Sequence, residues 1–305
     1  MTTPPPSDDL SDRFAFGANW ARFLRVVDES RIAAAVASLQ QMLGLERLDG
    51  MTFLDVGSGS GLFSLAAHRL GARVHSFDYD PKSVACTQEL QRRYGSDEPS
   101  WTIEQGSALD TEFLSKLAPA DIVYSWGVLH HTGDLWTAVE RVAGRVSPAG
   151  VFFLAVYNDQ GRTTDQWMCV KRMYQALPQF LRPLLVAACG MAILTHRLWQ
   201  LFVTIVLRLL ACQNPLKPAR ELARSARRVN PRGMHRWYDL VDWVGGWPFE
   251  VARPDEVFSF LSQRGFELVR MQTVGGKMGC NEYVFARRPA QSHRQTPERR
   301  TLSGG

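Results

Sequence analysis

Three alternating glycines have the spacing expected of a turn that binds a nucleotide cofactor. Gly57, Gly59 and Gly61 alternate with serines directly after an apolar run at residues 53–56, which predicts a buried strand. Glycine lets a chain turn tightly and brings backbone N–H groups against a ligand without an intervening side chain. Residues 62–67 predict a helix, whose N-terminal end adds positive partial charge. This strand, turn and helix predict a cofactor site at the carboxyl end of a sheet.

Two carboxylates near this turn distinguish between cofactors. Asp55 lies two residues before the first glycine, and Asp78 ends the next predicted strand, residues 73–77. An acid roughly 20 residues beyond the turn can accept hydrogen bonds from ribose hydroxyls. Asp55 would repel a pyrophosphate, but it suits a cofactor that carries an ammonium and a sulfonium group. The pattern therefore favours such a cationic cofactor over a dinucleotide.

At these residues the chain resembles the class I S-adenosylmethionine (SAM)-dependent methyltransferases. Residues 53–61 are similar to the first motif of that family, and Asp78 resembles its ribose-binding acid. Residues 105–108 resemble the adenine-binding turn, 121–126 the fourth strand, and 147–156 the turn into the fifth strand.

The resemblance covers about residues 14–158 and 251–288. It departs from the family at Ser107, where many members carry an aspartate on the adenine amino group. Serine can still accept that hydrogen bond.

The resemblance implies an α/β fold, with a Rossmann-like, mostly parallel sheet of seven strands, helices on both faces and a helical insertion after the fifth strand. It implies SAM as the cofactor. No metal is expected, because the histidines are scattered and form no metal-ligand cluster. The residues that would hold SAM are Asp55, Gly57, Gly59, Gly61, Asp78, Tyr79, Ser107, Ala108 and Trp126.

Composition sets broader limits. The 305 residues are 45% hydrophobic, enough for a large core, and the formal charge of +5 is too small to indicate nucleic-acid binding. The five cysteines form no CxxC pair, which is typical of reduced thiols in a cytoplasmic protein. Residues 1–12 lack the basic start and apolar stretch of a signal peptide, so we expect a cytoplasmic protein.

The pattern divides the chain into five parts. Residues 1–12 are expected to be disordered, and residues 13–157 form the SAM-binding core. Residues 158–250 are a helical insertion that caps the substrate site, because the core fold does not need them. Residues 251–288 complete the core sheet, and the polar tail at 289–305 is expected to be disordered.

The insertion contains an apolar stretch at 181–212 followed by a basic stretch at 217–236. Arg182, Arg197 and Arg208 interrupt the apolar stretch, so no uncharged run reaches the ~18–20 residues of a membrane span. One interpretation is a cap buried on the core with a solvated basic face.

The other interpretation is that residues 181–236 contact an anionic membrane surface, which would place the protein peripherally at the inner membrane face. Aromatic residues do not interleave with the arginines, so no nucleic-acid partner is expected.

Two adjacent histidines follow the fourth predicted strand, where the transferable methyl group would lie. A hydroxyl acceptor must lose its proton, and histidine is well suited to accept it. This region resembles the ubiquinone-pathway O-methyltransferases, in which a Glu-His pair stands at the corresponding positions. His131 aligns with their histidine and is the expected general base, and His130 is a weaker candidate. The alternative is that His131 only shapes the turn.

An acceptor site should be built from aromatic and polar residues near these histidines. The segment around Trp20 is either a lid over the cofactor or part of the core, and residues 235–243 are either a substrate wall or a packed aromatic hinge. The residues expected to line the acceptor site are Trp20, Tyr157, Asn158, Trp237, Tyr238 and Asp242.

These features predict a SAM-dependent methyltransferase that methylates an oxygen of a small or lipid-like acceptor. The acceptor classes considered are a phenol, a quinone precursor, a glycan and a natural-product intermediate. One alternative is a nicotinamide-dependent oxidoreductase on a similar sheet. The other is a non-catalytic protein that binds SAM or docks on a membrane.

Overall fold

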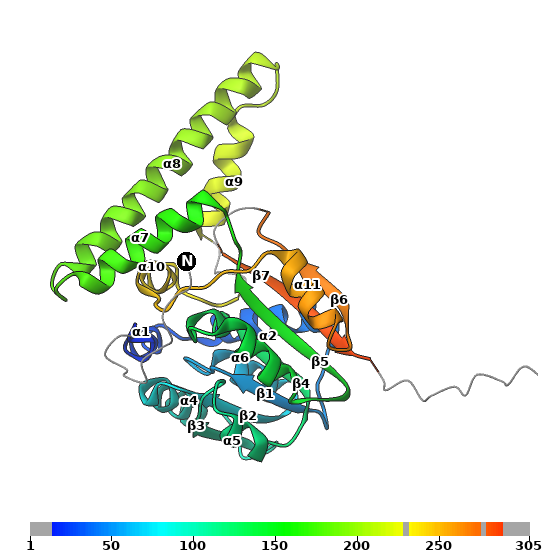
Figure 1. Cartoon of the computed structure of the whole chain (residues 1–305). Helices are drawn as coiled ribbons and strands as arrows, with labels where there is room; N and C mark the ends of the chain where they lie inside the picture. The colour runs from blue at the N-terminus through cyan, green and yellow to red at the C-terminus, as the bar shows by residue number, and fades with distance from the viewer. Residues whose placement is uncertain (1–13, 228–231, 276–278, 289–305) are drawn as a thin grey trace, which may run out of the picture.

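A seven-stranded sheet lies at the centre of the computed structural model, which describes residues 14–227, 232–275 and 279–288 (Figure 1). The strand order is β3-β2-β1-β4-β5-β7-β6. The first five strands pair in parallel, and β7 runs antiparallel to both β5 and β6. This is the Rossmann-like arrangement that the sequence predicts. The strands are β1 (Thr52–Val56), β2 (Arg73–Asp78), β3 (Trp101–Gln105), β4 (Ala120–Trp126), β5 (Val146–Tyr157), β6 (Phe266–Gln272) and β7 (Cys280–Arg287).

Helices cover both faces of the sheet, so the central strands are buried on both sides. Alternate side chains of β1 enter different cores, with Phe53 in one and Leu54 in the other. The Phe53 side packs against α2 (Glu29–Leu43), α3 (Leu62–Arg69) and α4 (Pro81–Tyr94). The Leu54 side packs against α5 (Thr111–Lys116), α6 (Leu135–Ala143) and α11 (Pro254–Ser262).

The short helix α1 (Phe16–Phe23) is fixed next to the start of α4. Asp80 caps α4 by accepting a hydrogen bond from the Lys82 amide, and Pro81 occupies the first turn. The other oxygen of the same carboxylate accepts a hydrogen bond from the Gly17 amide at 2.8 Å. One aspartate therefore caps one helix and holds the other, which places Trp20 over the carboxyl end of the sheet.

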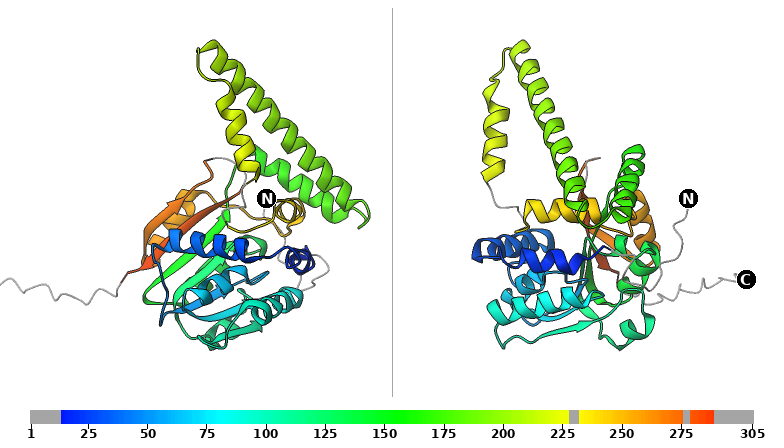
Figure 2. Two further views of the ribbon diagram at one scale, coloured as in Figure 1. Left: turned by 180° about the vertical axis from the view of Figure 1, so that it is seen from behind. Right: turned by 90° about the vertical axis from the view of Figure 1, so that its left-hand side faces the viewer.

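Four helices lie between β5 and α11, where the sequence predicts an insertion: α7 (Arg162–Ala176), α8 (Arg182–Leu210), α9 (Leu216–Arg227) and α10 (Arg236–Gly245). Helices α7 and α10 pack on the end of β5 in a third core that includes Tyr157, Tyr174 and Trp243. Helices α8 and α9 extend beyond the rest of the molecule in both orientations (Figures 1 and 2). We call these two helices the arm.

Helix α8 is the one described helix that is long and apolar enough to cross a membrane, by length and composition alone. It has 29 residues and a mean hydropathy of 1.4, and none of its apolar window is buried. The three arginines in the sequence argue against a span, whereas this helix meets the length and composition requirement. The segments at 1–12 and 289–305 lie outside the described residues.

Candidate functional site

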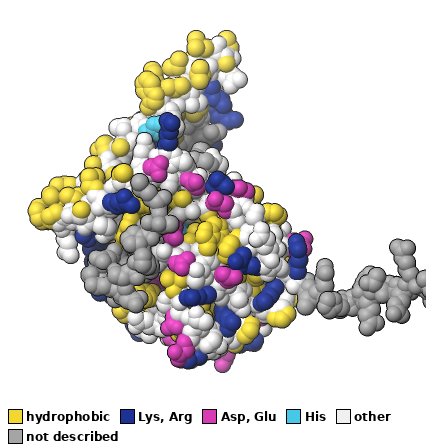
Figure 3. Space-filling view, in the orientation of Figure 1, with side chains coloured by type: hydrophobic (Ala, Val, Ile, Leu, Met, Phe, Trp, Pro, Cys, Tyr) yellow, Lys and Arg dark blue, Asp and Glu magenta, His cyan; other side chains and the backbone are white. Residues whose placement is uncertain are grey.

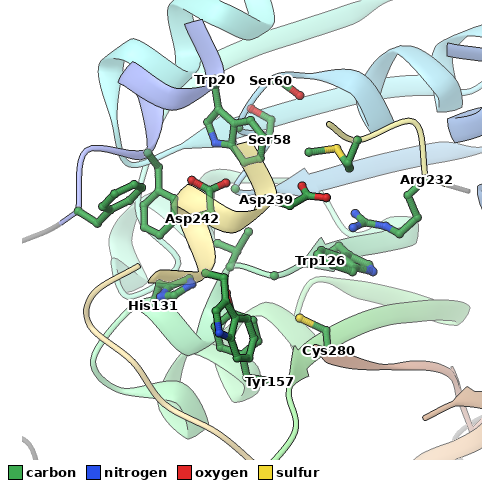
Figure 4. A pocket seen from close by; sticks show the side chains of 18 of the residues that line it. Trp20, Ser58, Ser60, Trp126, His131, Tyr157, Arg232, Asp239, Asp242 and Cys280 are labelled. Carbon is green, nitrogen blue, oxygen red and sulfur yellow. The ribbon is translucent and has the colours of Figure 1, made fainter. Parts of the chain in front are cut away.

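A cavity of about 1080 Å³ lies above the carboxyl ends of β1, β2 and β4 (Figure 4). The glycine turn after β1 lines one end, and helices α8 and α10 line the other. Sites for one small molecule are typically ~300–1,000 Å³. The volume therefore suits two ligands held side by side.

The turn between β1 and α3 requires glycine for both conformation and space. Gly57, Gly59 and Gly61 have φ angles of +78°, +57° and +79°, a region that side chains disfavour. A Cβ atom at Gly59 would lie 2.8 Å from Nε1 of Trp20, and one at Gly57 would lie 2.3 Å from Cγ1 of Val128. Gly57 and Gly59 line the cavity, whereas Gly61 caps α3 behind it. Gly61 was predicted to contact the ligand, but it shapes the turn instead.

Asp78 fixes the glycine turn and faces the cavity. Its Oδ2 atom accepts a hydrogen bond from the Gly59 amide, and its Oδ1 atom accepts one from the Asp80 amide, both at 2.9 Å. Burial raises the pKa of Asp78 to about 6, although these amide donors oppose the shift. The carboxylate is thus held in place before any ligand arrives.

Asp55 lies deeper and ends a chain of buried hydrogen bonds. Trp101 Nε1 donates to Ser76 Oγ at 2.9 Å, Ser76 Oγ donates to Ser64 Oγ at 2.8 Å, and Ser64 Oγ donates to Asp55. Burial raises the pKa of Asp55 to about 7, the Ser64 bond opposes this rise, and the nearby charge of Asp78 adds to it. A cation bound in the cavity would favour the ionised form of both carboxylates.

The other predicted cofactor residues also line the cavity: Tyr79, Ser107, Ala108 and Trp126. The floor next to Trp126 is bare, because Gly127 has a φ of +74° and nothing lies within 4 Å of an added Cβ atom.

His131 lines the cavity from the short 3₁₀ helix η2 (Leu129–His131). Its Nδ1 atom lies 2.6 Å from the Pro248 carbonyl oxygen, which can only accept, so Nδ1 carries the proton in a neutral ring. Nε2 is then the basic nitrogen. The rings of Phe16 and Tyr157 pack around this imidazole at centroid distances of 4.8 and 5.3 Å. The geometry suits a general base.

His130 does not reach the cavity, so its predicted catalytic role is withdrawn. Its side chain is fully buried, its ring centroid lies 3.8 Å from that of Tyr157, and its Nδ1 atom accepts a hydrogen bond from the Tyr157 amide at 3.3 Å. Burial lowers the pKa of His130 well below its usual range, so it remains neutral. It supports the end of β5.

Three of the six predicted acceptor residues line the cavity, namely Trp20, Tyr157 and Asp242. The other three do not. The Asn158 side chain accepts a hydrogen bond from Asn281 instead, at 2.9 Å. Trp237 is 46% exposed on the outer side of α10, and Tyr238 packs against Phe23.

Several cavity residues were not predicted. Asp239 projects from α10 toward the cavity beside the predicted Asp242, and Arg232, also not predicted, lies near Asp239 (Figure 4). The Arg232 guanidinium lies 3.0 Å from the centre of the Trp126 ring. Asn19 donates a hydrogen bond to the Asp242 carboxylate at 2.7 Å. The spacing of 239 and 242 places both on one face of a helix, a signal that the sequence contains.

Lys171 is a buried basic residue behind the wall of the cavity that α10 forms with Asp239 and Asp242. It donates a hydrogen bond to the Trp243 carbonyl oxygen, and its Nζ atom lies 4.6 Å from the centre of the Phe249 ring. Burial lowers the pKa of Lys171 to about 7, and burial raises the pKa of Asp242 well above its usual range. Both shifts reduce the charge that the wall must carry at neutral pH.

Among residues 14–227, 232–275 and 279–288, no group of three or more His, Cys, Asp or Glu side chains could hold a metal ion. The polar groups that line the cavity include carboxylates, hydroxyls, the His131 imidazole, the Cys280 thiol and the Arg232 guanidinium. This set suits an organic cation and a proton transfer.

The central part of the chain is similar to known methyltransferases. Residues 54–152 match the family model described as a methyltransferase domain. A ubiquinone biosynthesis O-methyltransferase from Methylobacterium sp. (strain 4-46) is 33% identical over 118 residues, which cover 38% of this chain and 45% of that protein. A ribosomal protein L11 methyltransferase from Halorhodospira halophila (strain DSM 244 / SL1) is 35% identical over 109 residues, 35% of each chain.

The chain spans less than half the length of those two relatives. Among solved structures, an O-methyltransferase family protein from Burkholderia thailandensis aligns with a TM-score of 0.51 and 13% identity. It covers 91% of this chain and 60% of its own, and it supports the fold.

Proposed function

We propose that this chain, which contains a class I methyltransferase domain at residues 54–152, transfers a methyl group from SAM to an oxygen of a lipid-like acceptor. The observation that carries the proposal is the cavity. It joins a glycine turn with two buried carboxylates to a histidine turn, and its volume suits a cofactor and an acceptor together.

The residues present fit SAM. Asp78 offers carboxylate oxygens to the ribose hydroxyls, and the bare backbone at Gly57 and Gly59 leaves room for the aminoacyl part of the molecule. Asp55 favours the cationic groups of SAM by charge. Ser107 and Ala108 lie where the adenine would contact the turn after β3. A dinucleotide is not favoured, because a pyrophosphate would meet both carboxylates.

When bound, SAM supplies an electrophilic methyl group on a positively charged sulfur. The chain then has two tasks, to position the acceptor oxygen against that methyl group and to remove its proton. His131 Nε2 accepts the proton as the oxygen–carbon bond forms, and the electron pair of the broken carbon–sulfur bond stays on sulfur. Pro248 keeps the proton on Nδ1, so that Nε2 is the ring nitrogen that can accept a proton.

The acceptor is inferred from the walls of the cavity. Apolar side chains of the arm and of α10 line its far end, including Ile193, Leu194 and Leu240. The ubiquinone biosynthesis O-methyltransferase named above also makes a quinone precursor a reasonable class of acceptor. A ring hydroxyl on an apolar molecule fits both observations.

A labelling experiment tests the proposal. The purified chain is incubated with SAM that carries a trideuterated methyl group and with an apolar extract of cells that lack the protein. We expect an apolar product that is heavier by one trideuteromethyl group, together with S-adenosylhomocysteine (SAH). Absence of both, from protein that binds SAH, would reject the enzymatic function and favour a non-catalytic SAM-binding protein.

Affinity for SAM is expected to rise with pH. Because cation binding requires ionised Asp55, whose pKa is about 7, the affinity should increase roughly tenfold per pH unit below that value and level off above it. The Asp55→Asn variant should bind weakly, with a much flatter dependence. Calorimetry between about pH 5.5 and 8 measures the SAM affinity of the unmodified chain and of the variant. If the affinity of the unmodified chain did not change with pH, ionised Asp55 would not be required for SAM binding.

We also propose that the arm docks on an anionic membrane surface. Figure 3 shows hydrophobic side chains at the outer end of the arm with Lys and Arg side chains beside them. The exposed apolar residues there include Trp199, Leu207 and Leu210, and α9 carries Lys217, Arg220 and Arg224. An apolar surface next to a basic one matches the acyl region and the charged headgroups of such a membrane.

Sedimentation with lipid vesicles tests the docking. Binding to phosphatidylglycerol vesicles should exceed binding to phosphatidylcholine vesicles, and replacing Lys217, Arg220 and Arg224 with glutamine should weaken it roughly a hundredfold. The pair Leu207→Gln and Leu210→Gln should weaken binding to both kinds of vesicle. The matched pair Phe258→Gln and Val269→Gln, exposed on the core, should not. Self-association that the arm variants abolish, without vesicle binding, would instead assign this surface to a second copy of the chain.

A further inference from the structure

The far end of the cavity is built by the arm itself. Gly190, Ile193 and Leu194 of α8 line it together with Leu222 of α9 and Leu240 of α10. The polar residues of the reaction site, His131 and Asp242 among them, line the same cavity nearer the sheet. The part of the arm that lines the cavity is therefore mainly apolar, and Arg197 of α8 is the charged residue among the described residues there.

At Gly190, α8 lies close to Leu240 of α10. A Cβ atom at this position would lie 2.9 Å from Cδ2 of Leu240, with no other atom within 4 Å. A larger side chain at residue 190 would displace Leu240 or enter the cavity. The absence of a side chain thus keeps the apolar end of the cavity open beneath α8.

An apolar stripe continues from this point along α8. Leu194, Leu198 and Phe202 follow Gly190 at intervals of four residues, so successive positions are neighbours in a ridge that turns about 40° around the helix at each step. Leu194 lines the cavity and is 50% exposed, whereas Leu198 and Phe202 lie farther along and are 49% and 57% exposed. Leu194 therefore connects the interior of the cavity with the exposed surface of the arm.

We infer that the acceptor is an amphiphile whose apolar tail leaves the cavity beneath Gly190 and runs over Leu194 toward Leu198 and Phe202. This inference rests on the proposed function, since it assigns the polar head of the same acceptor to the space next to His131. The arm then has two roles, because the stripe that holds the tail leads to the surface that docks on lipid. A tail could pass from a bilayer to the site without full exposure to water.

A series of alkylcatechols tests this tail site without vesicles present. Methylcatechol, butylcatechol and octylcatechol share one hydroxylated ring and differ in tail length. In calorimetric titrations with SAH present, affinity should rise with tail length, by up to roughly fourfold for each methylene that becomes buried. Turnover with SAM, measured as kcat/KM for each compound, should rise in the same order.

Two kinds of variant locate the tail. The pair Ile193→Gln and Leu194→Gln should reduce the ratio of octylcatechol to methylcatechol affinity at least tenfold, because it makes the apolar wall polar. Gly190→Phe should reduce the same ratio by filling the space. Thr195→Gln, an exposed neighbour on α8 outside the cavity lining, should leave the ratio unchanged. Retained SAH binding shows that each variant is folded at the cofactor end.

The outcomes separate the two proposals. Equal affinity of the unmodified chain for all three catechols, or a ratio that the Ile193 and Leu194 changes leave intact, would overturn the tail site. Binding that grows with tail length but gives no methyl transfer would support the tail site and count against methylation of a catechol hydroxyl. Failure to bind SAH would contradict the proposed function. Binding of the catechols that increases with tail length would still support the tail site, even without SAH binding.

Discussion

Replacing Gly59 with arginine is expected to abolish binding of SAM and SAH while the chain still folds. The position has a φ of +57° and its added Cβ atom would meet Trp20 at 2.8 Å, so any side chain there must enter the cavity or displace the tryptophan. Arginine also brings a positive charge to the place where a cationic ligand should bind. Calorimetric titration with SAH should show no saturable heat.

Gly50→Arg is the matched control for this variant. Gly50 also has a left-handed conformation, with a φ of +75°, but it is exposed and nothing lies within 4 Å of an added Cβ atom. Both variants should lose about 1–2 kcal/mol of stability from backbone strain. Only the change at Gly59 should affect binding. If Gly59→Arg bound SAH normally, the glycine turn could not be the cofactor site.

Replacing His131 with alanine is expected to lower kcat by roughly 10²–10⁴-fold, with little change in SAH affinity. The imidazole lies on the acceptor side of the cavity and has its basic Nε2 atom set by the bond from Nδ1 to Pro248. Its loss removes the proton acceptor but leaves the glycine turn, Asp78 and Asp55 in place. Rates are measured at saturating SAM so that protonation of Asp55 does not enter.

His131→Asn separates catalysis from support of the loop. Its side-chain amide can still donate a hydrogen bond to the Pro248 carbonyl oxygen, but it cannot act as a base. A general base predicts that both variants are slow. If asparagine restored the rate, His131 would serve only to shape the turn.

The cofactor end could be predicted from the sequence because its signals are local. Gly57, Gly59 and Asp78 act through backbone conformation and strand ends, and the strand order follows from alternating strands and helices. The observed sheet confirms the predicted fold, and the match of residues 54–152 to a methyltransferase domain supports the predicted cofactor, whereas the roles of Gly57, Gly59 and Asp78 stay predictions.

The acceptor end depends on which face of each element is turned inward, and the sequence did not determine this. His130 and His131 are adjacent, but only the second reaches the cavity, because the first lies under Tyr157. On α10 the predicted Asp242 and the unpredicted Asp239 line the cavity, whereas the predicted Trp237 and Tyr238 do not. The aromatic content of residues 235–243 correctly indicated that this helix lines the cavity. Packing of α10 against α1 determines which of its faces is turned toward the cavity.

Titration of the full chain with SAH and, separately, with NADH tests the central claim most directly. We expect saturable binding of SAH at one site per chain, lost in the Gly59→Arg variant, and no transfer of protein fluorescence to NADH. Saturable NADH binding that the same variant abolishes, with no heat from SAH, would show that the cavity holds a nicotinamide dinucleotide and would contradict the account.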